Sequence, residues 1–197
     1  MDFTNPPRTF VLVDGVIAPR LFRSLYGRYA ASIELHGDEA VLEFGCGSGG
    51  ISEYLAPRLQ HGSLTCVDVC PPMLSIARRR LEKYANVRCL TGRVEELSLD
   101  KASIDMVVIH NALHDVQEEN RFRTLETLVG ILKAGGRMCV REPTKPSHGM
   151  PVAAYRELMT KAGLSEVHSK ETRVFPIGPV FEAVFVKTPS ASLQQTT

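Results

Sequence analysis

The stretch 41–50, VLEFGCGSGG, combines an acidic residue with closely spaced glycines. Glu43 stands two residues before the first glycine, and four glycines follow within six positions. Glycine admits positive φ angles and has no Cβ, so the main chain of such a stretch can touch a ligand directly. The stretch predicts a site where bare backbone and a carboxylate lie together.

Two ligand-binding patterns overlap in these residues. Gly45, Gly47 and Gly50 fit G-x-G-x-x-G, the dinucleotide pattern. Gly45, Gly47 and Gly49 fit G-x-G-x-G instead, and a tight turn without a ligand is a third interpretation. Glu43 distinguishes the two ligand-binding patterns, because its carboxylate would repel a pyrophosphate and attract an ammonium group. The other interpretation of Glu43 is a carboxylate that caps the glycine turn.

A second acidic residue, Asp68, ends the next apolar run. A carboxylate at that position can accept hydrogen bonds from both hydroxyls of a ribose. An ammonium group at one end of the ligand and a ribose at the other describe S-adenosylmethionine better than NAD. We therefore hold an NAD-dependent oxidoreductase as a distant alternative.

The segment 110–116, HNALHDV, carries the residues best suited to acid–base chemistry. His110 and His114 are the candidate catalytic residues, and Asp115 could orient His114 as a base. His110 could instead bond only to the local backbone or to the cofactor carboxylate, and His114 could have a structural role. A metal site built from these three residues is not expected, because their spacing would need a helix and the segment leaves a strand.

The surrounding pattern predicts the elements that position these residues. Apolar runs predict strands at 40–44, 63–69, 87–92, 104–110 and 137–142, and helical patterns cover 50–60, 71–85 and 119–136. This alternation is typical of parallel strands joined by right-handed crossovers. Gly135-Gly136 predict the C-terminal stop of the third helix.

The end of the chain departs from this alternation. After a helical segment at 150–164, extended segments at 165–175 and 181–188 flank a short turn, as in an antiparallel hairpin. We therefore expect an α/β fold: a Rossmann-like, doubly wound, seven-stranded and mostly parallel sheet with a C-terminal antiparallel hairpin strand.

Three regions follow from this pattern. Residues 1–38 are predicted to form a helical cap, residues 39–188 the ligand-binding domain, and residues 189–197 a flexible polar tail. In the cap, Tyr26 and Tyr29 stand at helical spacing. They could close over a cofactor or substrate, or they could be ordinary packing.

Length, charge and cysteine content limit the function classes. The chain has 197 residues, enough for one domain, and its net charge of +1 argues against a nucleic-acid partner. No run approaches the roughly 18 apolar residues of a membrane span, and the N-terminus does not resemble a signal peptide. Five cysteines without CxxC spacing indicate reduced thiols. We expect a cytoplasmic protein, monomeric or homodimeric, with no membrane partner.

Taken together, these residues resemble the motifs of class I S-adenosylmethionine-dependent methyltransferases, of the small-molecule type that includes the ubiquinone-biosynthesis methyltransferases. VLEFGCGSG is similar to the first motif. VDVCPPMLSIAR is similar to the second, which implies that Asp68 binds the ribose and Met73 packs on the adenine. LTGRVEEL, IDMVVIHNALHDV and LVGILKAGGRMCVRE resemble the third, fourth and fifth. The match covers about residues 38–188.

Two positions depart from the family pattern. Arg93 replaces the usual acidic residue that holds the adenine amino group, so either the Val94 amide and Glu95 take over or the contact is weaker. Arg93 could also reach an anionic substrate or face solvent. Ala134 replaces the usual proline before the double glycine.

The resemblance implies S-adenosylmethionine as the cofactor and methyl transfer to a small-molecule acceptor by in-line displacement. The alternatives are a protein or nucleic-acid methyltransferase and a non-catalytic S-adenosylmethionine-binding protein. The implied cofactor-binding residues are Glu43, Phe44, Gly45, Cys46, Gly47, Gly49, Asp68, Val69, Met73, Arg93, Val94, His110, Asn111 and Tyr29.

Overall fold

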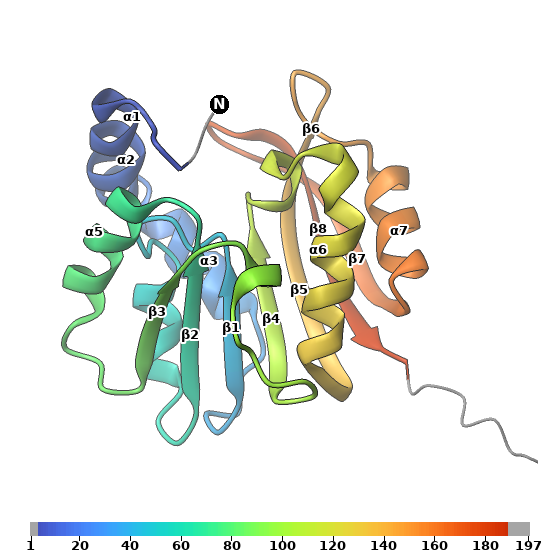
Figure 1. Ribbon diagram of the computed structural model, residues 1–197. Helices are drawn as coiled ribbons and strands as arrows, with labels where there is room; N and C mark the ends of the chain where they lie inside the picture. The colour runs from blue at the N-terminus through green and yellow to red at the C-terminus, as the bar shows by residue number, and fades with distance from the viewer. Residues whose placement is uncertain (1–3, 189–197) are drawn as a thin grey trace, which may run out of the picture.

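A single sheet runs through the computed structural model, which describes residues 4–188 (Figure 1). The predicted tail at 189–197 lies outside the described residues. Along the sheet the order is β3-β2-β1-β4-β5-β8-β7, and the short β6 pairs with β5 alone. The strands are β1 (Ala40–Phe44), β2 (Ser63–Asp68), β3 (Val87–Thr91), β4 (Ile104–His110), β5 (Leu132–Lys145), β6 (His148–Gly149), β7 (Leu164–Val174) and β8 (Gly178–Lys187).

Strand directions confirm the predicted fold class. β1 pairs in parallel with β2 and β4, and β2–β3 and β4–β5 are parallel too. β8 runs antiparallel to both β5 and β7, as the C-terminal hairpin predicted. This is a Rossmann-like sheet in which the order reverses between β1 and β4, the place where open α/β sheets bind ligands.

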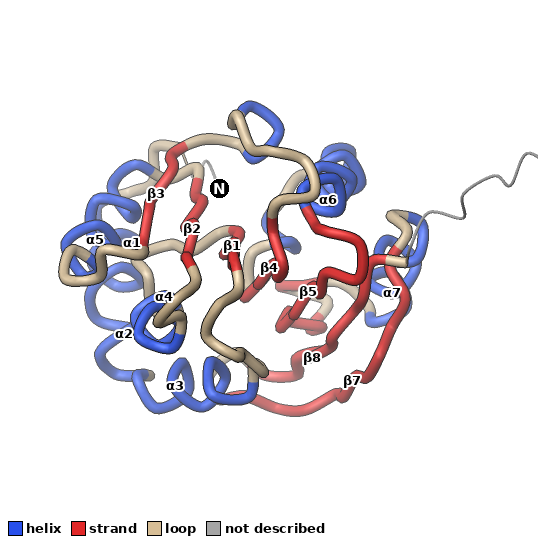
Figure 2. Tube along the Cα trace, turned by 90° about the horizontal axis from the view of Figure 1, so that it is seen from below, coloured by secondary structure: helices blue, strands red, loops and turns tan. Residues whose placement is uncertain are grey.

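Helices cover both faces of the sheet (Figure 2). The helices of the domain are α4 (Ser52–Leu55), α5 (Pro71–Leu81), α6 (Glu118–Ile131) and α7 (Val152–Lys161). Side chains alternate along β1: Leu42 packs in the core under α6 and α7, whereas Val41 packs in the core under α4 and α5. Within residues 4–188, no helix has the length and apolar character needed to cross a membrane.

The front of the described chain is helical, and its first helix begins at Arg8. It comprises α1 (Arg8–Leu12), a π-helical turn η1 (Val13–Ile17), α2 (Ala18–Leu21) and α3 (Arg23–Ser32). At Gly15 this segment packs so closely on α5 that an added Cβ would lie 2.9 Å from the Met73 sulfur. A small residue at this point brings the cap onto the helix that follows β2.

Each predicted helix of the domain ends earlier than its sequence pattern indicates; α5, for example, ends at Leu81 instead of residue 85. The pattern at 50–60 yields only α4 and a 3₁₀ turn, η2 (Ala56–Arg58), which contains Pro57. The predicted stop at Gly135-Gly136 was wrong, because α6 ends at Ile131. Leu132 already pairs with Ile104 of β4, and this pairing extends the backbone before the glycines are reached.

Candidate active site

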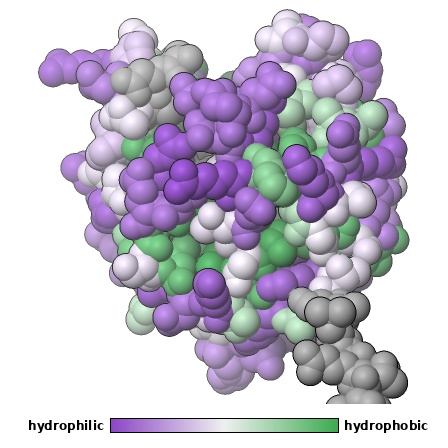
Figure 3. Space-filling view, turned by 45° about the vertical axis from the view of Figure 1, so that its right-hand side comes forward, coloured by the Kyte–Doolittle hydropathy of each residue, from purple (hydrophilic) through white to green (hydrophobic). Residues whose placement is uncertain are grey.

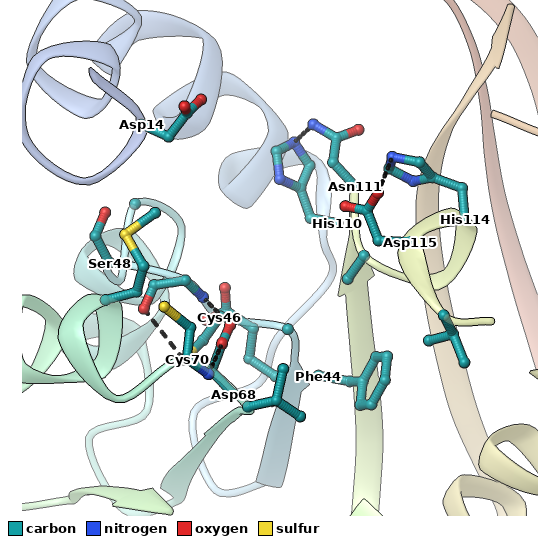
Figure 4. A pocket seen from close by; sticks show the side chains of 18 of the residues that line it. Asp14, Phe44, Cys46, Ser48, Asp68, Cys70, His110, Asn111, His114 and Asp115 are labelled. Atoms are coloured by element: carbon teal, nitrogen blue, oxygen red, sulfur yellow. Dashed lines mark hydrogen bonds and ion pairs between the residues drawn. The ribbon is translucent and has the colours of Figure 1, made fainter. Parts of the chain in front are cut away.

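A pocket of about 1230 Å³ opens at the carboxyl ends of β1, β2 and β4, under the helical cap. Figure 3 shows the molecule hollowed at the top, the edge at which these strands end in Figure 1. Figure 4 shows the side chains that point into the pocket. Most of the predicted cofactor residues line it, namely Glu43, Phe44, Gly45, Cys46, Gly47, Asp68, Val69, Met73, Arg93, Val94, His110 and Asn111.

The glycine turn after β1 forms one wall of the pocket. Gly45 has a φ of +68°, and an added Cβ would collide with the side chain of Ala112. The N–H groups of Gly45 and Cys46 both donate to the Val67 carbonyl, at 2.8 and 3.1 Å. Gly47 has a φ of +53°, and nothing lies within 4 Å of the position its Cβ would take. The turn therefore leaves bare backbone open to a ligand.

Glu43 is a buried carboxylate beside this turn. Its Oε2 accepts a hydrogen bond from the Ser52 hydroxyl at 2.5 Å, so it is tied to α4. Burial raises the pKa of Glu43 to about 8, the Ser52 hydrogen bond works against that rise, and the nearby charge of Asp68 adds to it. A buried carboxylate of this kind gains most from a cationic partner.

Asp68 closes the other end of the glycine turn. Its carboxylate accepts hydrogen bonds from the N–H of Gly47 at 2.7 Å and the N–H of Cys70 at 2.8 Å (Figure 4). Burial raises the pKa of Asp68, and these backbone donors only partly offset that rise. The capping role considered for Glu43 is thus performed by Asp68, which also lines the pocket.

His110 lies at the end of β4 between two tyrosines of the cap. Its ring centre is 5.7 Å from that of Tyr26 and 5.3 Å from that of Tyr29. Burial, with a smaller effect of the Arg141 charge, lowers the pKa of His110 to about 3. The neighbouring Asn111 has a buried Oδ1 without a hydrogen-bond partner among the described residues.

His114 is oriented by a residue that the sequence analysis missed. Its Nδ1 lies 2.7 Å from Oε2 of the fully buried Glu142, whereas its Nε2 lies 3.5 Å from Asp115. Sequence reasoning offered Asp115 as a carboxylate that could orient His114; the structure adds Glu142 of β5, which lies nearer and at the opposite ring nitrogen. Burial lowers the pKa of His114, but Glu142 outweighs burial and the net change is upward.

Glu142 also holds the turn η4 (Leu113–Asp115) that carries His114. It accepts hydrogen bonds from the N–H groups of Ala112, Leu113 and His114, at 2.7, 3.0 and 3.1 Å. In the sequence Glu142 ends a strand next to that of His110, which is a signal that could have identified it.

Two predicted cofactor residues, Gly49 and Tyr29, are not among those lining the pocket. A Cβ on Gly49 would lie 3.4 Å from Ala77 and Leu81, so this glycine lets the turn pack closely against α5. Tyr29 is buried with its ring 4.0 Å below the Arg141 guanidinium. Arg93 lines the pocket but lies 3.8 Å from Glu95, so its charge already has a partner.

Comparison with known proteins identifies a methyltransferase domain. The family model described as "Methyltransferase domain" matches residues 41–136. The phthiotriol/phenolphthiotriol dimycocerosates methyltransferase of Mycobacterium leprae is 29% identical over 144 residues, which cover 73% of this chain and 52% of that protein. An uncharacterized methyltransferase of Mycobacterium tuberculosis is 33% identical over 113 residues, which cover 56% of this chain and 54% of that protein. The chain spans about half the length of these relatives.

Solved structures share the fold at low sequence identity. A SAM-dependent methyltransferase from Aquifex aeolicus matches with a TM-score of 0.71 and 18% identity, over 86% of this chain and 98% of that one. The 1,6-didemethyltoxoflavin-N1-methyltransferase of Burkholderia thailandensis matches with a TM-score of 0.68 and 18% identity, over 91% and 81%. The strand order, the glycine turn with its two carboxylates and the family match agree. Over residues 41–136 the chain is similar to the methyltransferase-domain family, and its fold is that of solved class I S-adenosylmethionine-dependent methyltransferases.

Proposed function

We propose that this protein transfers the methyl group of S-adenosylmethionine to a small-molecule acceptor by in-line displacement. One observation carries the proposal: the glycine turn lies on the wall of a covered pocket, between the buried carboxylate of Glu43 and the carboxylate of Asp68. Glu43 is suited to the methionine ammonium group and Asp68 to the ribose hydroxyls. Met73 and Val94, both buried and both at the pocket wall, are suited to the adenine.

The size of the pocket favours an enzyme over a protein that only binds the cofactor. Its volume of about 1230 Å³ exceeds the roughly 300–1,000 Å³ that hold one drug-sized ligand. An acceptor would therefore have room beside the cofactor. The Burkholderia enzyme, whose structure contains 1,6-didemethyltoxoflavin and S-adenosylhomocysteine, supports a small acceptor.

The residues near the acceptor side fit a displacement at a sulfonium. The leaving group is a neutral thioether, so the protein mainly has to align the reactants and exclude water. His110 stays uncharged at neutral pH because its pKa is about 3, and this avoids a second cation next to the sulfonium. The unpartnered Oδ1 of Asn111 offers a hydrogen-bond acceptor to a ligand. Catalytic roles of His110 and His114 stay predictions.

Isothermal titration tests the cofactor first. We expect micromolar binding of S-adenosylmethionine and S-adenosylhomocysteine, no binding of NAD, and at least tenfold weaker binding to Asp68→Ala. Asp100→Ala, at an exposed position, is the matched control and should bind like the wild type. Binding of NAD alone, or of none of the three, contradicts the proposal.

Turnover then separates an enzyme from a binding protein. Incubation with S-adenosylmethionine and a panel of small thiols, phenols, amines and carbon acids should release S-adenosylhomocysteine with at least one class of acceptor. If the protein binds the cofactor, transfers to no small molecule, and instead methylates protein or nucleic acid, the acceptor part of the proposal is wrong.

A further inference from the structure

Nε2 of His114 has a carboxylate 3.5 Å away but makes no hydrogen bond within the described part of the chain. The side chain is buried and lies against the pocket, yet its Nε2 has no hydrogen-bond partner among the described residues. A buried polar atom without a partner costs free energy, so its persistence calls for a ligand. The Nδ1 atom is occupied by Glu142 at 2.7 Å, so only Nε2 remains to bind one.

Two further metal-ligand side chains surround this nitrogen. The Asp115 carboxylate lies 3.5 Å from Nε2, and the rings of His114 and His148 are 4.5 Å apart. One ligand atom from each of the three residues lies within 4.8 Å of the other two. Two ligands about 2.1 Å from a tetrahedral zinc ion are roughly 3.4 Å apart, so a small closure of this cluster completes the geometry. Figure 4 shows the Asp115 carboxylate beneath the His114 ring.

The elements that carry these ligands hold them in place. Glu142 accepts from Nδ1 of His114 and from three backbone amides of η4, the arrangement that orients histidine ligands toward metals. His148 is carried by the β5–β6 hairpin, where Lys145 pairs with His148. Gly149, with a φ of +143°, lets the chain pass against the Pro143 carbonyl, which a Cβ would block. His148 thereby reaches His114 from a segment far along the chain.

We propose that Nε2 of His114, the Asp115 carboxylate and the His148 imidazole bind a divalent transition-metal ion, with Zn²⁺ as the best fit. Two histidines and one carboxylate leave at least one coordination position open, as in catalytic zinc sites. A metal site at His110, His114 and Asp115 was not expected, because their spacing would need a helix and the segment leaves a strand. The fold replaces His110 by His148, which no helical spacing could have indicated.

The site has a consequence for the acceptor, and this part rests on the proposed function. All three ligand residues line the same pocket as Glu43 and Asp68. An acceptor hydroxyl bound to the open position would lose its proton to water at a lower pH. Its oxygen would then form the new bond to the methyl carbon while the carbon–sulfur bond breaks and its electron pair stays on sulfur.

Metal binding is measurable without any methyl transfer, so the two proposals fail separately. Untagged protein, stripped with a chelator, is titrated with Co²⁺ under visible spectroscopy, and Zn²⁺ then displaces the Co²⁺. We expect one equivalent of Co²⁺ to give d–d absorption bands, and Zn²⁺ to abolish them. His148→Ala and Asp115→Asn should each weaken Co²⁺ binding at least tenfold. Both side chains are exposed, so these variants should keep the fold, which circular dichroism checks.

The matched control is His61→Ala, an exposed histidine in the turn before β2, which should leave the titration unchanged. Absence of d–d bands at one equivalent overturns the proposal. So does binding that survives both ligand variants. A thiolate-to-cobalt charge-transfer band also overturns it, since it would place the ion on a free cysteine such as the partly exposed Cys89.

Discussion

Glu43 is the residue whose charge state should change when the cofactor binds. Burial puts its pKa at about 8, so most molecules of the free protein carry it protonated at pH 7. An ammonium group beside the carboxylate stabilises the charged form and lowers this pKa. Binding of S-adenosylmethionine at pH 7 should therefore release close to one proton more from the wild type than from Glu43→Gln.

Calorimetric titrations at pH 7 in two buffers of different ionisation enthalpy measure this release. Affinity of the wild type should rise as the pH is raised from 6 to 8, because less work is then needed to ionise Glu43. Glu119→Gln, at an exposed position, should behave like the wild type. Equal proton release by the wild type and Glu43→Gln would contradict the assignment of Glu43 as the residue that binds the ammonium group.

Two glycines offer a matched pair for the conformation of the turn. In Gly45→Ala the new Cβ meets the Ala112 side chain, at a φ of +68° that alanine rarely adopts. We expect it to lose at least about 2 kcal/mol of unfolding free energy and to bind the cofactor poorly. At Gly130, in α6, nothing lies within 4 Å of an added Cβ. Gly130→Ala should gain about 0.5–1 kcal/mol. Urea unfolding measures the change in unfolding free energy for each variant. Similar changes in both variants would contradict the turn geometry.

At the scale of elements, Glu39 fastens the loop that leads into β1. It accepts hydrogen bonds from the N–H groups of His36 and Gly37 at 2.7 and 2.8 Å, and its own carbonyl accepts one from Ser63, where β2 begins. Burial alone would raise the pKa of Glu39, but these backbone donors and the His36 side chain lower it to about 2. The loop at this end of the sheet thus depends on an ionised carboxylate.

Acid should therefore weaken the fold through Glu39. Its folded-state pKa lies below the usual value of about 4.5, so its stabilisation is complete above pH 4.5 and disappears as the pH falls toward 2. Glu39→Gln should lose about 2 kcal/mol at pH 7, and its deficit against the wild type should shrink between pH 5 and pH 2. Thermal unfolding across this pH range measures the deficit. A deficit that is constant with pH would mean that Glu39 acts through packing.

At the scale of the whole molecule, the cap lies over the pocket and contributes Asp14, Phe22 and Tyr26 to its lining. Its outer side carries exposed apolar residues, including Leu12 and Leu21. A ligand in the pocket should hold the cap against the domain, because caps that cover active sites commonly close on ligands.

Limited trypsin digestion tests this closure. Saturating S-adenosylhomocysteine should slow cleavage after Arg20 and Arg23 at least threefold, and it should leave cleavage after Lys101, in an exposed loop, unchanged. Asp68→Ala should lose the protection. Equal cleavage rates in the cap with and without the ligand would indicate that the cap does not respond to the cofactor.

The sequence by itself determined the parts of the site that depend on one strand and its following turn. Glu43 and Gly45 are neighbours along the chain, and Asp68 ends the next strand, so the rule that parallel strands end at one edge places all three together. The alternation of strands and helices likewise determined the fold class, because the spacing of apolar residues within each segment is a local property.

Only the tertiary structure decided which distant residues complete the pocket. Glu142 stands 28 positions from His114, and His148 reaches it through a hairpin at the end of β5. Gly49 faces α5 and Tyr29 lies beneath Arg141, although both resembled cofactor contacts in the sequence. The early end of α6 follows from the pairing of Leu132 with β4. Each outcome depends on strand register and helix packing between remote segments, which local spacing does not specify.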